Sequence, residues 1–106
     1  MRNAPHRAQL LRQILSNVDG SASYDWLAEP ETGAIFTLLS AEEREQWNDG
    51  GGQVVEASVR IPNGFAPITT DRVRIVSPAA HSGDWAVVTV RHQADHARLM
   101  LRRVTG

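Results

Sequence analysis

The second half of the chain is a series of short runs in which apolar and polar residues alternate, and this pattern limits the fold more than any other feature. In residues 55–61 every second residue is apolar, which places the apolar side chains on one face of an extended strand. Turn residues such as Pro62-Asn63-Gly64 separate the runs. The pattern predicts a mainly β fold, a small antiparallel β-barrel or sandwich, with strands at residues 34–39, 54–61, 71–76, 85–92 and 98–104.

The inward faces of these strands predict the core. We expect the following residues to be mostly buried: Val59, Ile61, Val73, Ile75, Val88, Val90, Leu99 and Leu101. Trp26 and Trp85 are also expected in the core, because large aromatic side chains dominate the interior of a small domain. A chain of 106 residues is expected to form a single domain, residues 1–106.

Two helices are predicted. Residues 4–18 repeat Leu11, Leu15 and Val18 at spacings of four and three, which is typical of an amphipathic helix. Residues 19–33 are rich in Ser, Asp, Glu, Pro and Gly, so we expect a loop there.

The second helix is predicted at residues 41–48. Ser40 and Glu43 have the spacing of a capping box, in which each side chain bonds to the backbone N–H of the other residue. The helix is expected to end by Asn48, because three consecutive glycines follow it. The resulting glycine-rich segment is either a mobile tip or an ordinary surface loop. It consists of Asn48, Asp49, Gly50, Gly51, Gly52 and Gln53.

The charge and composition exclude several classes of function. The net charge is −1, so nothing global favours binding to nucleic acid or to a membrane. With no cysteine, the chain has neither disulfides nor thiolate metal sites. We expect no signal peptide and no membrane-spanning segment, because no apolar run is long enough.

The basic residues are all arginine, which makes better planar contacts at interfaces than lysine does. A GC-rich genome would also favour arginine. Arginines alternate outward on the predicted strands, either as a solvated face or as an interface. The possible interface residues are Trp47, Arg60, Arg72 and Arg74.

No sequence motif predicts catalysis. His92 and His96 are four residues apart with Asp95 between them, but they fall across a predicted hairpin loop, so we expect a surface turn rather than a metal site. The glycine triplet lacks the Lys-Ser/Thr of a phosphate-binding loop. The sequence therefore predicts a protein that is not an enzyme and that uses no cofactor and no metal.

The order of these segments resembles the head–tail joining (head-closure) proteins of tailed bacteriophages. In that family, a strand ending in a Leu-Ser-x-x-Glu-like segment precedes a loop, a Val/Ile/Arg-rich strand, a short Asp-Arg-Val strand and a closing hairpin. The corresponding segments here are residues 35–44, 56–61, 68–75, 83–90 and 98–102. Members usually open with a strand hairpin, whereas residues 4–18 are predicted here as a helix.

The resemblance implies a connector, stopper or adaptor at the virion neck, made in the cytoplasm of a bacterial host. It would form a homo-oligomeric ring of six or twelve copies, with a portal or adaptor protein on the head side and a tail protein on the other. DNA would pass through the ring without sequence recognition, and no membrane would be involved. The segment from Asn48 to Gln53 would line or gate the channel. Glu42, Glu43, Glu45 and Asp49 would stand near the lumen, where negative charge repels the DNA backbone.

Two alternatives remain open from the residues alone. The first is a small β-barrel interaction or nucleic-acid-binding module in another assembly. The second is a metal-dependent protein that uses His92 and His96.

Overall fold

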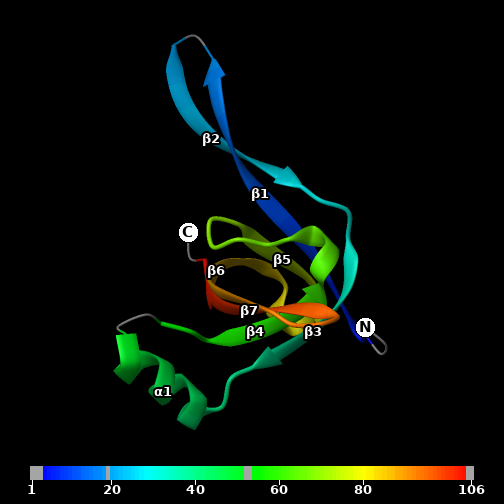
Figure 1. Ribbon diagram of the computed structural model, residues 1–106, viewed down its shortest axis with the longest axis vertical. Helices are drawn as coiled ribbons and strands as arrows, with labels where there is room; N and C mark the ends of the chain where they lie inside the picture. Colours follow the sequence, from blue (N-terminus) through cyan, green and yellow to red (C-terminus); the bar gives the residue numbers. More distant parts are fainter. Residues whose placement is uncertain (1–3, 19, 52–53, 105–106) are drawn as a thin grey trace.

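The structure is a computed structural model that describes residues 4–18, 20–51 and 54–104. In this part of the chain there are seven strands and one α-helix (Figure 1). Their bounds are β1 (His6–Val18), β2 (Ser21–Ala28), β3 (Thr32–Leu38), α1 (Ala41–Gly51), β4 (Ala57–Pro62), β5 (Arg72–Ser77), β6 (Gly83–His92) and β7 (His96–Arg103). Two short 3-10 turns, η1 (Asn63–Phe65) and η2 (Ala79–His81), lie in the connections on either side of β5.

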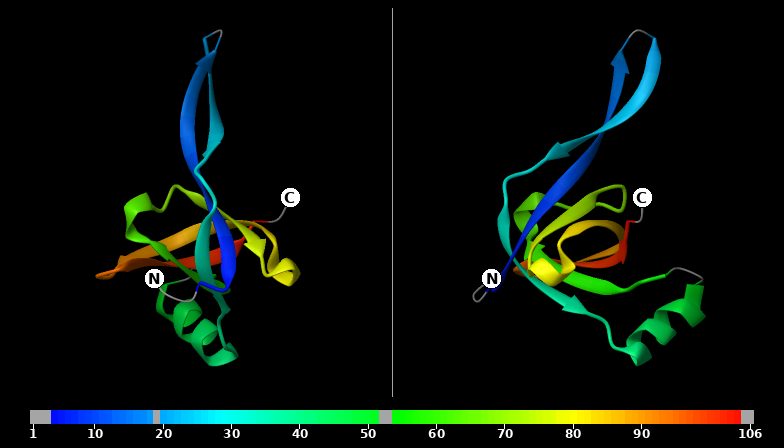
Figure 2. Two further views of the ribbon diagram at one scale, coloured as in Figure 1. Left: turned by 90° about the vertical axis from the view of Figure 1, so that its right-hand side faces the viewer. Right: turned by 180° about the vertical axis from the view of Figure 1, so that it is seen from behind.

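The strands form one antiparallel sheet that closes on itself. The order is β2-β1-β3-β4-β7-β6-β5, and β1 also pairs with β5. Six strands therefore close a barrel, while β2 pairs with β1 outside it (Figures 1 and 2). This pairing confirms the predicted mainly β, antiparallel fold, and it shows that the fold is a barrel. Closure leaves few exposed sheet edges in so small a domain.

The main core fills the barrel. Six of the eight residues predicted as core are buried there, and Leu99 and Leu101 are fully inaccessible. Trp85 also lies in this core, where its Nε1–H donates to the carbonyl oxygen of His81 at 3.1 Å. The prediction for Trp85 is therefore confirmed. The buried residues of the main core are Ala8, Leu10, Ala34, Phe36, Ala57, Val59, Ile61, Val73, Ile75, Trp85, Val87, Ala97, Leu99 and Leu101.

Val88 and Val90, both predicted as core, are only half-buried and lie on opposite faces of β6, which contains a bulge. The register with β7 shifts between Val87 and Thr89. The extra residue changes the face onto which the following side chains point. Val87 and Val90 therefore contact the main core, whereas Val88 packs against a second cluster under α1. The strict alternation that placed Val88 and Val90 together on the inward face was wrong.

The predicted helix at residues 4–18 is wrong: residues 6–18 are strand β1. The strand bonds in turn with β3, β5 and β2. These long-range backbone bonds replace the local bonds of a helix, and such tertiary pairing overrides intrinsic propensity. The leucine spacing reflects a strand with apolar residues on both faces. Leu10 and Leu11, adjacent in sequence, are both buried.

The predicted loop at residues 19–33 is also wrong, because most of it is β2 and the start of β3. Val18 pairs with Ser21, so β1 and β2 form a hairpin whose turn contains Gly20. Gly20 in that turn has a φ of 79°, a left-handed conformation that glycine adopts without strain. An Asp-Gly pair between two strands is a strong hairpin signal.

The capping box before α1 is confirmed. The Glu43 N–H donates to Ser40 Oγ at 3.2 Å, and the Ser40 N–H donates to Glu43 Oε1 at 3.3 Å. The predicted end of the helix at Asn48 is wrong, since α1 continues to Gly51. A glycine costs a helix only about 1 kcal/mol relative to alanine, so two glycines at the last turn do not end a well-capped helix.

Candidate interaction surfaces

The β1–β2 hairpin projects from the barrel as a two-stranded ribbon (Figures 1 and 2). The pairing of β1 with β5 ends at Leu11, and β2 is the partner of β1 from there to Val18. We call residues 13–27 the arm. A two-stranded ribbon is only marginally stable alone in water, so a long one needs support at its base or a partner along its length.

The arm exposes large apolar side chains on both of its faces. Leu15 and Tyr24 are direct cross-strand partners, and they are 61% and 64% exposed. The opposite face presents Ile14 and Leu27, which are also largely exposed. Contiguous exposed apolar surface on a small domain marks a site of interaction with another molecule.

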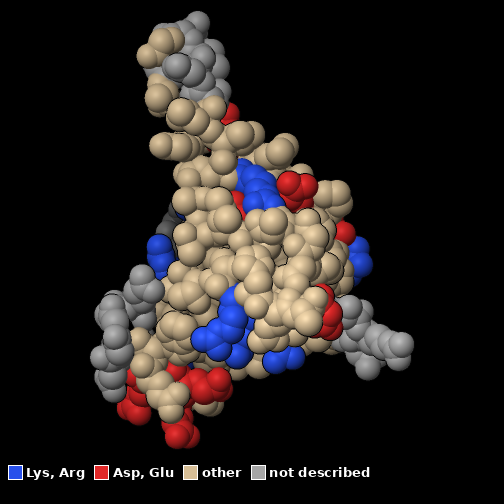
Figure 3. All heavy atoms as spheres, viewed as in Figure 1, with Lys and Arg blue, Asp and Glu red and all other residues tan. Residues whose placement is uncertain are grey.

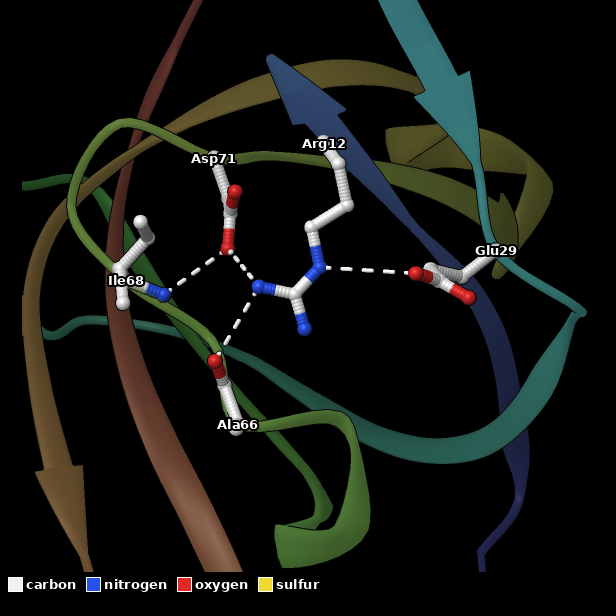
Figure 4. A network of polar contacts seen from close by, with 5 residues as sticks. All are labelled: Arg12, Glu29, Ala66, Ile68 and Asp71. Carbon is white, nitrogen blue, oxygen red and sulfur yellow. Dashed lines mark hydrogen bonds and ion pairs between the residues drawn. The ribbon is translucent and has the colours of Figure 1, made fainter. Parts of the chain in front are cut away.

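Arg12 holds the base of the arm to the barrel (Figure 4). One guanidinium nitrogen, Nη1, donates to Asp71 Oδ2 at 3.0 Å and to the carbonyl of Ala66 at 3.1 Å. Its Nε lies 3.6 Å from Glu29 Oε1. The buried Asp71 carboxylate also accepts the N–H of Ile68 at 2.8 Å. One arginine therefore ties β1 to the start of the β2–β3 connection and to the loop before β5.

Trp26 supplies a second support for the arm. The guanidinium carbon of Arg72 lies 4.6 Å from the centre of a Trp26 ring, a cation–π contact. Trp26 is nevertheless 37% exposed, so its predicted place in the core is wrong. Ala22, Tyr24 and Trp26 alternate along β2, and this period-two spacing is the sequence signal that would have identified the strand.

The predicted interface residues lie on different sides of the barrel. Arg60 is exposed on β4, whereas Arg72 and Arg74 are on β5, three strands away in either direction around the closed sheet. Arg74 donates from Nε to Asp84 Oδ1 at 2.9 Å, and this hydrogen bond raises the pKa of Arg74 above its ordinary value. Arg72 contacts Trp26 as described. The three arginines do not form one surface.

Trp47 lies on the inner side of α1, half-buried against a small second cluster of Leu39, Val55 and Met100. Beside it is a cavity of about 170 Å³ between α1 and the outer face of β6 and β7. We call this cavity the arginine pocket. It is lined by Glu43, Trp47, Thr89, Arg91, Arg98 and Met100.

Three arginines form a row across the outer face of the sheet next to this pocket. In the strand register Arg60 pairs with Arg98, and Arg98 pairs with Arg91. Like charges directly opposite each other on neighbouring strands are destabilising. Among the side chains that the structure describes, none of the three forms an ion pair. The Nε of Arg98 is buried and makes no hydrogen bond. Sequence reasoning missed Arg91 and Arg98, because only the register places them together with Arg60.

Four of the six residues of the predicted channel segment are helical. Asn48, Asp49, Gly50 and Gly51 belong to α1, and Gly52 and Gln53 lie outside the described residues. Glu42 and Glu45 are exposed on the helix, and Figure 3 shows the acidic residues gathered at this end of the molecule.

His92 and His96 are at the ends of β6 and β7, across the hairpin turn. His92 Nδ1 is 3.3 Å from Asn63 Oδ1, and His96 Nδ1 is 2.6 Å from Asp95 Oδ1. The hydrogen bond with His96 lowers the pKa of Asp95. Within the described ranges, no three His, Cys, Asp or Glu side chains are grouped to hold a metal ion. No helix in the same ranges is long and apolar enough to cross a membrane.

Comparison with known proteins supports the fold and gives no information about the function. No protein-family model matches the chain, and no curated protein matches it. A solved structure, the solution structure of protein SF1141 from Shigella flexneri 2a, is similar with a TM-score of 0.73 at 14% identity. The match covers 96% of each chain. At this identity the likeness shows the fold alone, and it includes nearly the whole chain.

Proposed function

We propose that this chain is a non-catalytic subunit of the neck of a tailed phage or phage-like particle, where it forms a ring that connects the portal region to the tail. The observation that carries the proposal is the arm. A small barrel with a projecting ribbon whose large apolar side chains face solvent is suited to assembly with other subunits. A chain that acted alone would gain nothing from this exposed surface.

The arm also bears on the one difference noted between this sequence and the head–tail joining family, the helix predicted for residues 4–18. Members of that family usually open with a strand hairpin, and residues 6–28 form one. The order of the later strands is the order on which the resemblance rests. These features support the connector class, and they leave the choice between adaptor, stopper and tail-side ring to experiment.

In this proposal the end of α1 and the residues up to Gln53 line the channel. The exposed acidic side chains of Glu42 and Glu45 on α1 would face the DNA, whose phosphates they repel, so that DNA slides through the ring. Since residues 48–51 are helical, a gate would move as the end of a helix rather than as a free loop.

Deletion of the gene in the phage or phage-like element that encodes it tests the connector role. We expect DNA-filled heads and separate tails that fail to join, because the ring that bridges them is missing. Wild-type protein supplied from a plasmid should restore joined particles. A variant with Leu15 and Tyr24 both changed to Ser should fold but restore few of them, since it removes the apolar surface of the arm.

A matched control is Ile68→Ser, which also removes an exposed large apolar side chain but lies in the loop before β5, outside the arm. This variant should restore joining as the wild type does. Normal tailed, infectious particles after deletion would overturn the connector role.

The alternative, a nucleic-acid-binding module, is favoured by the row formed by Arg60, Arg98 and Arg91. Binding of DNA by the isolated protein that weakens steeply with salt, and that is lost in Arg60→Ala and Arg91→Ala, would support this alternative over the connector.

A further inference from the structure

We propose that the arginine pocket receives the arm of a second copy of this chain, with the Asp25 carboxylate placed between Arg91 and Arg98. The inference rests on the proposed ring and names the contact that would build it. It joins two features that are otherwise unexplained in the single chain, a solvent-exposed apolar ribbon and a row of like charges.

The pocket has the chemistry of a carboxylate site. Arg91 and Arg98 are cross-strand neighbours, the buried Nε of Arg98 has no hydrogen-bond partner, and Thr89 adds a hydroxyl. Planar guanidinium groups bind carboxylates through paired hydrogen bonds. A carboxylate between them would also remove the repulsion between the two arginines.

The pocket favours a singly charged group attached to an apolar surface. Glu43 is a lining residue and is engaged by Ser40, so one negative charge already stands at the rim and disfavours a doubly charged phosphate. Trp47 and Met100 form an apolar wall. The volume of about 170 Å³ is far above what one water needs, and it can admit the side chain of an aspartate.

The arm presents such a group. Residues 13–27 contain two aspartates and no lysine or arginine, whereas the pocket face carries the arginine row. Asp25 is exposed on β2 and pairs in register with Ile14. Leu27 lies two residues along the strand and so shares that face. The carboxylate is therefore presented between two exposed apolar side chains, Ile14 and Leu27, which match the wall of the pocket.

The contact must be made between copies. The arm and α1 are at opposite ends of the molecule in every view, and the longest dimension of the molecule is 48 Å (Figures 1 and 2). An arm therefore cannot reach the pocket of its own chain. A surface at one end that binds a different surface at the other end is a head-to-tail contact, which closes into a ring when its rotation allows.

Cysteine cross-linking tests the contact directly, because the natural chain contains no cysteine. Full-length protein carrying Ser23→Cys, on the same arm face as Asp25, is mixed at high concentration with protein carrying Thr89→Cys, and the mixture is mildly oxidised. We expect a disulfide-linked dimer in clear excess over the matched control, in which Ala94→Cys at the exposed β6–β7 turn replaces Thr89→Cys.

Charge reversal then tests the recognition. With Arg91→Glu or Asp25→Arg, the cross-linked fraction should fall about tenfold, because like charges then meet. When every copy carries both changes, the yield should recover. A yield no greater than that of the Ala94→Cys control, or one that charge reversal leaves unchanged, would overturn the proposal. Joined particles fail to form after gene deletion whether or not this contact exists, so that experiment tests the connector role separately.

Discussion

Leu101→Ala is expected to lower the free energy of unfolding by about 2–5 kcal/mol, through lost burial and the cavity left behind. Leu101 is fully buried on β7, and its register partners are Ala57 on β4 and Val87 on β6. It is thus enclosed by the two strands that flank β7 in the barrel. Chemical denaturation measures the effect, and the melting temperature should fall by at least about 8 °C in a domain of this size.

The matched control is Leu15→Ala, the same change at a residue that is 61% exposed on the arm. We expect it to change the free energy of unfolding by less than about 0.5 kcal/mol. Equal effects of the two changes would mean that β7 does not lie in the core, or that the arm is buried within a single chain.

Arg12→Ala is expected to destabilise the fold by about 3 kcal/mol, because it leaves a buried carboxylate without its charged partner. The side chain of Asp71 is only 2% exposed, and it would keep only the N–H of Ile68. Adding Asp71→Asn should recover part of the loss, since a neutral amide is less costly to leave in the interior. Urea denaturation of the single and double variants measures both effects.

A control on the same strand is Arg7→Ala. Arg7 forms an ion pair with Glu31 at 3.3 Å, and both side chains are about half exposed. Exposed pairs contribute about 0–1 kcal/mol, so this variant should be nearly as stable as the wild type. A loss from Arg12→Ala no larger than that from Arg7→Ala would show that the base of the arm is not held by this network.

The barrel strands could be predicted because their signal is local. Where one face is buried and the other is solvated, as in β5, alternation in the sequence reports the burial directly. The capping box of Ser40 and Glu43 was predictable for the same reason, since all of its atoms lie within one turn of helix.

The prediction for the first third of the chain failed because its structure depends on pairing with strands that are distant in the sequence. β1 bonds to three different strands, and in the arm both faces carry apolar residues, so the alternation that identifies a strand is lost. The arginine pocket could not be predicted from the sequence, for a related reason. Arg60, Arg91 and Arg98 come together only through the pairing of three strands, and the bulge after Val87 sets which side chains of β6 face outward.

The most direct test of the central claim is a cryo-electron microscopy reconstruction of the neck of purified particles made by the element that encodes this protein. We expect a closed ring of six or twelve copies between portal and tail, with each arm extending onto a neighbouring copy. Particles whose necks contain no copy of this chain would contradict the connector role.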